Sequence, residues 1–309
     1  MDLNQRDEEV AARIANRTRF PGWQVVSPKP DIPYTIATAI SDRIQERPLT
    51  MKIIRYTAND GDAPRFGILQ DDTVFEAEGE LFDGFTVGAE VGPVDGVTLL
   101  APIEPGKVMA IGLNYVDHVT ELDKTRELPT SPVVFMKPQS AIIGPDAAIE
   151  LVNPENPTHY EAELVVVIGK TATNVAEADA FDYILGYTAG NDVSDRTVQH
   201  GGGQWIRGKG FDTYLPLGPV IETDLDISDI RVQSRLNGEA RQSESTKSLI
   251  FSIPFLISFL TNGMTLNPGD VIMTGTPHGV GPMKEGDVIE VEVEGVGILR
   301  NPVKNRASA

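Results

Sequence analysis

Three acidic residues form a candidate metal-binding site. Glu161 and Glu163 are separated by one residue at the start of the apolar run 164–168, which predicts a β-strand. Alternate residues of a strand share a face, so both carboxylates should point the same way. Asp192 follows a second apolar segment at 184–188. Neighbouring carboxylates repel one another unless a cation or a proton lies between them, and an all-oxygen set suits Mg²⁺ or Mn²⁺.

Two other interpretations of these glutamates have to be weighed. Glutamates at alternate positions of a strand more often form a solvated face. His159 would complete a zinc motif of the deaminase type with Glu161, but that motif also needs cysteines, and the chain has none.

A histidine and a glutamate three residues apart form a candidate general base. If residues 118–121 are helical, His118 and Glu121 lie on one face and can touch. Glu121 would then fix the tautomer of His118 and raise its basicity, so that the imidazole could activate water. The alternative is a surface histidine that is merely solvated.

Further polar residues are candidates for binding a substrate. Arg196 can bind a carboxylate and Gln199 can bond to an oxo group, and a structural ion-pair partner is an equal alternative for Arg196. Thr276 lies in the glycine-rich segment 274–281, whose backbone N–H groups could bind a carboxylate unless it is only a tight turn. Tyr160 and Lys137 are weaker candidates, and Lys137 could simply brace the site.

Hydrophobic patterns indicate which elements position these residues. Strands are expected over 108–111, 133–136, 164–168, 271–274 and 288–293, and a helix over 252–260. Residues 1–50 are predicted to form an N-terminal extension with two short helices. Residues 51–105 should form a small β-rich domain, and residues 106–309 a larger catalytic domain. No GxGxxG segment follows a strand, which argues against a dinucleotide-binding fold.

The charge and composition of the chain exclude some classes of binding partner. The formal net charge is −19, which disfavours nucleic acid and anionic membranes. The absence of cysteine fits a reducing compartment, no apolar run reaches the ~20 residues needed to span a bilayer, and the N-terminus lacks a signal-peptide pattern. A cytoplasmic protein is therefore expected. An anionic substrate would need local positive charge, from a divalent cation and a few lysines or arginines.

The chain resembles the fumarylacetoacetate hydrolase superfamily in many short segments that occur in the same order across residues 51–304. The matching segments are IGLNYVDH at 111–118, FMKP at 135–138, YEAEL at 160–164, GYTAGNDVS at 186–194, KGFDT at 209–213, PLGP at 216–219, NGE at 237–239 and PGDVIMTGTP at 268–277. The resemblance implies a mainly β (α+β) protein: a twisted mixed β-roll preceded by a small β-rich domain. It also implies a homodimer.

The resemblance also implies a chemistry. Family members carry out Mg²⁺- or Mn²⁺-dependent C–C hydrolysis, decarboxylation or isomerisation of 2-oxo acids, with metal ligands that match Glu161, Glu163 and Asp192. It places Lys209 against the substrate oxyanion, where it would stabilise an enolate; otherwise Lys209 is an exposed loop residue. In the acylpyruvase-like branch a histidine–glutamate pair at the place of His118 and Glu121 activates water.

These observations predict a Mg²⁺-dependent hydrolase that cleaves a C–C bond of a small, anionic 2,4-dioxo acid through a stabilised enolate. Three alternatives stay open. The same enolate would serve an oxaloacetate-type decarboxylase or an isomerase of a 2-hydroxy-diene-dioate, and a non-catalytic metal-binding homologue would keep the fold without the reaction.

Overall fold

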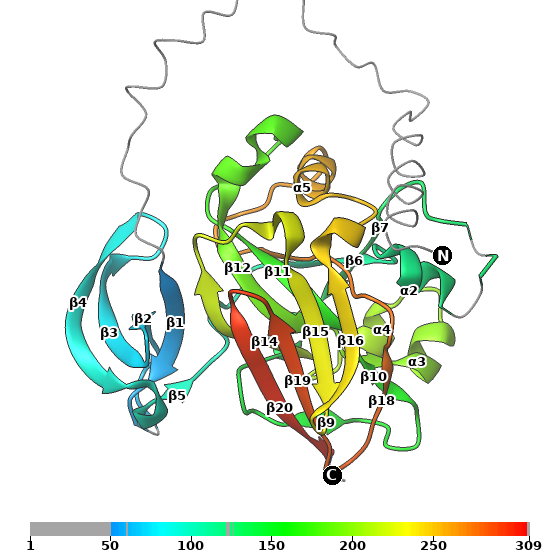
Figure 1. Cartoon of the computed structure of the whole chain (residues 1–309), viewed down its shortest axis with the longest axis horizontal. Coiled ribbons are helices and arrows are strands. Elements are labelled where there is room, and N and C mark those ends of the chain that lie inside the picture. The colour runs from blue at the N-terminus through cyan, green and yellow to red at the C-terminus, as the bar shows by residue number, and fades with distance from the viewer. Residues whose placement is uncertain (1–50, 60, 122–123, 126, 308–309) are drawn as a thin grey trace, which may run out of the picture. The chain divides into compact units, whose positions relative to one another are not determined.

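The computed structural model describes residues 51–307, with the exception of residues 60, 122–123 and 126. The N-terminal extension predicted for residues 1–50 lies outside the described residues. Among those described, no helix is both long and apolar enough to cross a membrane. The protein is mainly β with few helices, as the sequence predicts (Figure 1).

The largest sheet joins the N-terminal strands of the described chain to the strands around the acidic residues. Its order is β4 (Gly84–Pro93), β3 (Thr73–Glu80), β2 (Arg65–Gln70), β1 (Lys52–Thr57), β14 (Leu215–Glu222), β12 (Ile184–Asn191), β11 (Ala162–Ile168), β17 (Val271–Met273), β6 (Val108–Gly112) and β7 (Val133–Lys137), with β5 (Thr98–Leu99) beside β1 and β8 (Ile142–Ile143) beside β14. The sheet is mixed, since β17 pairs with β6 in parallel and with β11 in antiparallel orientation.

Two smaller sheets complete the β-structure. A five-stranded sheet has the order β16 (Glu239–Ser245), β15 (Arg231–Leu236), β19 (Val288–Val293), β20 (Gly297–Asn305) and β9 (Ile149–Leu151). A three-stranded sheet has the order β13 (Ser194–Asp195), β10 (Thr158–Tyr160) and β18 (Gly281–Met283). In Figure 1 the five-stranded sheet lies in front of β11, β12 and β14, and β11 contacts both β15 and β19.

Strand β11 is apolar because both of its faces are buried. Leu164 and Val166 pack in a core that includes Val291 of β19. The alternate residue Val165 belongs to a second core with Ile53 of β1. A strand covered on both sides has no polar face to alternate with, which explains the unbroken run of hydrophobic residues after Glu163.

The helices are short. They are α2 (Val116–Thr120), α3 (Arg196–His200), α4 (Ile206–Lys209) and α5 (Ile253–Thr261), with 3₁₀ turns at Val94–Gly96, Gln139–Ala141, Glu177–Tyr183, Ile227–Asp229 and Thr246–Ser248. The helix predicted over 252–260 is α5. Ser252 lies just before it as the N-cap, with its hydroxyl accepting a hydrogen bond from the Phe255 N–H.

Candidate metal centre and active site

The three carboxylates predicted to bind a metal lie together. Strands β11 and β12 are antiparallel and pair Ala162 with Asn191, so the residues next to that pair, Glu161 and Asp192, are neighbours. The Asp192 N–H donates to the Glu161 carbonyl at 2.9 Å. Glu161 lies just before β11 and Glu163 within it. One oxygen from each of the three carboxylates lies within 4.8 Å of the other two.

The three carboxylates are buried, so their negative charges need a neighbouring cation or a proton. Glu161, Glu163 and Asp192 are exposed by 5%, 2% and 1%. Burial, together with the negative charges of Asp192 and Glu161, raises the pKa of Glu163 well above its usual range. Burial also acts to raise the pKa of Glu161, but Lys209 and Arg196 outweigh it and lower that pKa below the usual range. Glu163 is thus the carboxylate that most needs a proton or a cation.

Lys209 is buried against the triad rather than exposed in a loop. It ends α4 and is 2% exposed. Its Nζ donates to Glu161 Oε2 at 2.9 Å, to Asp192 Oδ2 at 2.6 Å and to Ser194 Oγ at 2.7 Å. An ammonium group has three donors, so all three have protein acceptors. Lys209 therefore holds Glu161 and Asp192 in place, and a bond to a substrate oxyanion would replace one of its three contacts.

Arg196 forms the structural ion pair that the sequence left open. One of its terminal nitrogens lies 2.6 Å from Glu161 Oε1, and the other donates to Gln199 Oε1 at 2.9 Å. The adjacent Asp195 does not compete for the guanidinium: its carboxylate accepts hydrogen bonds from the Asn153 and Asn156 side chains and caps α3. Arg196 and Gln199 thus lie beside the triad, with the arginine already paired to Glu161, one of the predicted metal ligands.

His118 and Glu121 are in contact, as their spacing predicts. His118 lies in α2 and Glu121 directly follows it, with His118 Nδ1 3.2 Å from Glu121 Oε2. The other oxygen of Glu121 accepts the Gly279 N–H at 2.9 Å. Burial opposes ionisation of Glu121, yet these two hydrogen bonds lower its pKa. After Lys209 and Arg196, His118 also contributes to lowering the pKa of Glu161, so the imidazole acts electrostatically on the triad.

The glycine-rich segment after β17 supports the centre through its backbone. The Gly275 N–H donates to Glu163 Oε2 at 2.8 Å. Thr276 is 3% exposed, and its hydroxyl accepts from Gln242 Nε2 at 2.8 Å. The Tyr160 hydroxyl donates to the Gly279 carbonyl at 3.0 Å. In this structure Tyr160 and Thr276 therefore fix the segment to neighbouring elements.

Sequence reasoning missed two amides that anchor this segment. Gln242 bonds to Thr276 and to the Pro277 carbonyl, and its Oε1 accepts the Ala162 N–H. Asn114 Nδ2 donates to the Thr274 carbonyl at 2.8 Å. Asn114 lies in one of the motifs quoted above, which was a usable signal, whereas nothing local marks Gln242.

Buried polar atoms without a partner lie close in sequence to the triad. Among the described residues, His159 Nδ1 and Asn191 Nδ2 are two such atoms. Asn191 is next to Asp192 in the chain, and His159 is two residues before Glu161. Buried polar atoms are normally satisfied. Together with a set of three carboxylates, they fit a hard divalent cation that carries water or substrate.

Comparison with known families identifies the chain. Residues 107–304 match the family model described as fumarylacetoacetate (FAA) hydrolase C-terminal. The chain belongs to the fumarylacetoacetate hydrolase family. Residues 51–102 match a second model, Rv2993c-like N-terminal.

Relatives within the fumarylacetoacetate hydrolase family carry several activities in their names. Oxaloacetate tautomerase fahd2 of Xenopus laevis is 42% identical over 220 residues, which cover 67% of this chain and 68% of the relative. The structure of 5-carboxymethyl-2-hydroxymuconate delta-isomerase from Mycobacterium smegmatis is 43% identical, with a TM-score of 0.75 over 83% of this chain and 100% of that one. Maleylpyruvate hydrolase from Sphingobium sp. SYK-6, in complex with manganese (II) ion and pyruvate, is 29% identical with a TM-score of 0.69 and the same coverage.

Proposed function

We propose that this fumarylacetoacetate hydrolase family member is a metal-dependent enzyme that hydrolyses a C–C bond of a small 2,4-dioxo acid of the acylpyruvate type. The observation that carries this proposal is the contact between His118 and Glu121 beside the three carboxylates. A hydrolase needs a base for water as well as a group that stabilises an enolate, and this chain offers candidates for both.

Glu161, Glu163 and Asp192 would hold Mg²⁺ or Mn²⁺. Three buried carboxylate ligands match the preference of these ions for oxygen, and the manganese and pyruvate in the related maleylpyruvate hydrolase support the assignment. When bound, the ion would act as a Lewis acid on the oxygens of a 2-oxo acid. Lys137 and Lys209 hold the Asp192 carboxylate in place, because each donates to one of its oxygens.

The chain's own residues would then handle protons and orient the substrate. His118 Nε2 would take a proton from water, while the Glu121 carboxylate holds Nδ1 and stabilises the imidazolium. The attacking water would add to the 4-oxo carbon, and cleavage of the C3–C4 bond would leave the electron pair on the pyruvate fragment as an enolate. The Thr276 hydroxyl, which accepts a hydrogen bond from Gln242, would donate its proton to the substrate carboxylate. Lys209 would stabilise the enolate by exchanging one of its protein contacts for the substrate oxygen.

A second candidate is tautomerisation of oxaloacetate. Its support is the Xenopus laevis oxaloacetate tautomerase, which is 42% identical. That reaction needs the enolate and a proton relay but no attack by water, so His118 could serve as the relay. Decarboxylation of oxaloacetate and isomerisation of a 2-hydroxy-diene-dioate pass through the same enolate, and the isomerase from Mycobacterium smegmatis favours the latter.

A substrate panel tests the proposal. Acetylpyruvate and oxaloacetate are offered to the metal-free protein and to protein loaded with Mg²⁺ or Mn²⁺, and pyruvate release and the keto–enol ratio of oxaloacetate are followed separately. We expect metal-dependent release of pyruvate from acetylpyruvate that is lost in His118→Ala and retained in His200→Ala, which changes an exposed histidine. Tautomerisation or decarboxylation of oxaloacetate without acetylpyruvate cleavage would replace the hydrolase proposal. Metal binding without any turnover would favour a non-catalytic homologue.

The mode of assembly and the location are part of this proposal. We propose a cytoplasmic homodimer that acts on a free anionic acid, without nucleic acid or membrane partners. The mass of the purified protein in solution, measured by light scattering, tests the dimer.

A further inference from the structure

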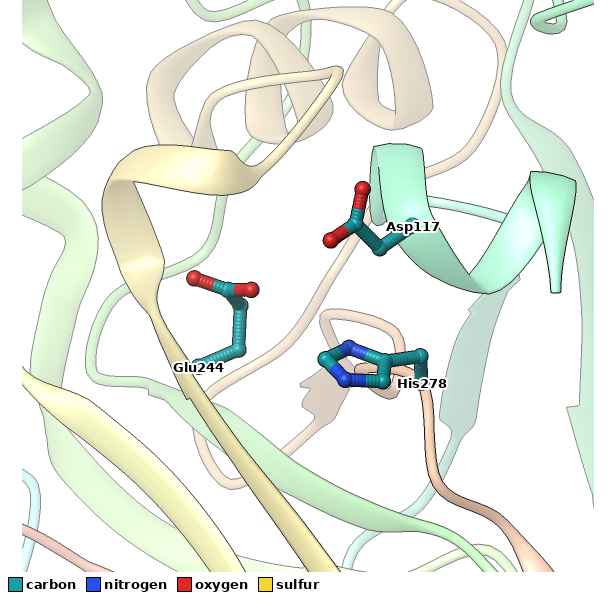
Figure 2. Close-up of side chains that lie close together, drawn as sticks. All are labelled: Asp117, Glu244 and His278. Carbon is teal, nitrogen blue, oxygen red and sulfur yellow. The ribbon is translucent and has the colours of Figure 1, made fainter. Parts of the chain in front are cut away.

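A second group of metal-binding side chains lies outside the triad. It consists of Asp117, Glu244 and His278, and one ligand atom from each lies within 4.8 Å of the other two. Figure 2 shows that they come from three separate segments, α2, β16 and the segment after β17, and that their side chains point toward a common space. We call these three residues the mouth cluster.

The chemistry of the mouth cluster differs from that of the triad. Atoms bound to one ion at about 2.0–2.2 Å are at most about 4.4 Å apart, so ligand atoms within 4.8 Å of one another can converge on one cation after a small movement of the side chains. One imidazole nitrogen with two carboxylates is a set that suits Zn²⁺ or Mn²⁺, whereas Mg²⁺ favours oxygen alone. Asp117 and Glu244 are partly buried and His278 is exposed, so an ion could enter from solvent.

A separate observation points to a ligand beside the cluster. Tyr115 is 1% exposed, and its hydroxyl has no hydrogen-bond partner among the described residues. The Tyr115 backbone forms a β-bridge with Leu249, five residues after Glu244 in the chain. The preceding residue, Asn114, donates a hydrogen bond to the Thr274 carbonyl, at the start of the segment that leads to His278. Burial, Glu163 and Glu244 together raise the pKa of Tyr115. Its buried hydroxyl thus lies within electrostatic reach of both Glu163 and Glu244.

We propose that Asp117, Glu244 and His278 bind a second divalent ion of the Zn²⁺ or Mn²⁺ type, and that water on this ion partners the Tyr115 hydroxyl. The ion would connect α2 to β16 and to the segment after β17. Because His118 lies in α2 and Glu121 directly follows this helix, the ion would restrain the candidate base next to the triad. This site is additional to the ion of the proposed function.

The test counts ions by titrating the metal-free full-length protein with Mn²⁺ in a calorimeter. Wild type should bind two ions per chain. His278→Ala and Glu244→Gln should each remove one, whereas Glu163→Gln should remove the other. His200→Ala is the matched control, because it changes another exposed histidine outside both groups, and it should leave two. Glu244→Gln changes no volume, so its result does not depend on how well His278→Ala folds.

The outcomes separate this proposal from the proposed function. A single ion in wild type that is lost in Glu163→Gln and unaffected by His278→Ala or Glu244→Gln would overturn the mouth site and leave the triad intact as the metal centre. A single ion lost in His278→Ala and kept in Glu163→Gln would support the mouth site and remove the metal from the proposed function. Two ions retained in both His278→Ala and Glu244→Gln would also overturn the mouth site.

Discussion

Lys137 and Lys209 bind the two oxygens of a single carboxylate, that of Asp192, at 2.5 and 2.6 Å. The two lysines are not equivalent. Burial lowers the pKa of Lys137, Asp192 opposes this, and Lys209 adds to the lowering. Burial also acts on Lys209, but Asp192 and Glu161 outweigh it and raise its pKa. The ammonium group of Lys209 therefore has a raised pKa, whereas that of Lys137 has a lowered pKa that Asp192 keeps from falling further.

Replacing Lys137 should destabilise the protein, because its side chain is 0% exposed and its loss leaves a buried carboxylate with one partner fewer. We expect Lys137→Met to lower the free energy of unfolding by about 3–5 kcal/mol, measured by urea denaturation. Lys247→Met is the matched control. It removes an exposed ion pair with Asp229 and should change stability little. Equal losses in the two variants would contradict this account of Lys137.

Metal binding should become weaker as the pH falls. Burial and two neighbouring carboxylates raise the pKa of Glu163, so in the metal-free protein a proton occupies this group up to a higher pH than usual. A cation must displace that proton, and binding should release it. Mn²⁺ calorimetry in buffers of different ionisation enthalpy measures the release. In Glu163→Gln the ion at the triad and the proton released with it should both be lost, and an ion that still bound at the triad with unchanged proton release would assign the proton to another group.

Glu121→Gln should reduce turnover about 10²-fold with little change in the metal affinity of the triad. Glutamine keeps an oxygen for the Gly279 N–H but cannot stabilise a charged His118. Comparing kcat for pyruvate release with the Kd for Mn²⁺ checks both parts. A variant that loses metal and activity together would show that Glu121 maintains the centre rather than the base.

The same substitution has a stability signature with a defined sign. The pKa of Glu121 is lowered in the folded protein, so its contribution is fully present above the unfolded value, about 4.3. It is lost as the pH falls through the lower, folded value. The stability difference between wild type and Glu121→Gln should therefore be largest near neutral pH and shrink in acid. A difference that grew on acidification would contradict the assignment.

Gly275→Ala should damage both the fold and the centre. Gly275 has a φ of +105°, and a Cβ there would lie 2.7 Å from Asn114 Cβ. Gly286 has a φ of +87° with nothing within 4 Å of the same position, so Gly286→Ala measures the backbone cost alone, about 1–2 kcal/mol. We expect Gly275→Ala to cost more and also to weaken metal binding, because the Gly275 N–H holds Glu163. Equal effects on stability and no effect on metal affinity would refute this role.

The sequence predicted the parts of the centre that local periodicity determines. The i, i+2 spacing of Glu161 and Glu163 and the i, i+3 spacing of His118 and Glu121 each brought two side chains together, because strand and helix geometry sets these distances. The strands themselves followed from their hydrophobic runs. The chemical roles of these residues stay predictions.

The contacts that sequence could not predict join distant segments. Gln242 of β16 donates a hydrogen bond to Thr276, which lies 34 residues away in the sequence. Lys209 makes its three bonds because α4 packs against β13 and β7. Periodicity within one segment carries no information about which other segment lies opposite, so these pairings required the three-dimensional structure.

The pairing of β1 with β14 has a consequence for shorter forms of the protein. Lys52 and Ile53 pair with Glu222 and Ile221, so the N-terminal strands shield one side of β14. A chain starting at residue 107 would leave part of β14 with unsatisfied backbone groups at an open edge. Such edges recruit strands from other molecules. The N-terminal strands thus protect the catalytic sheet against self-association as well as extending it.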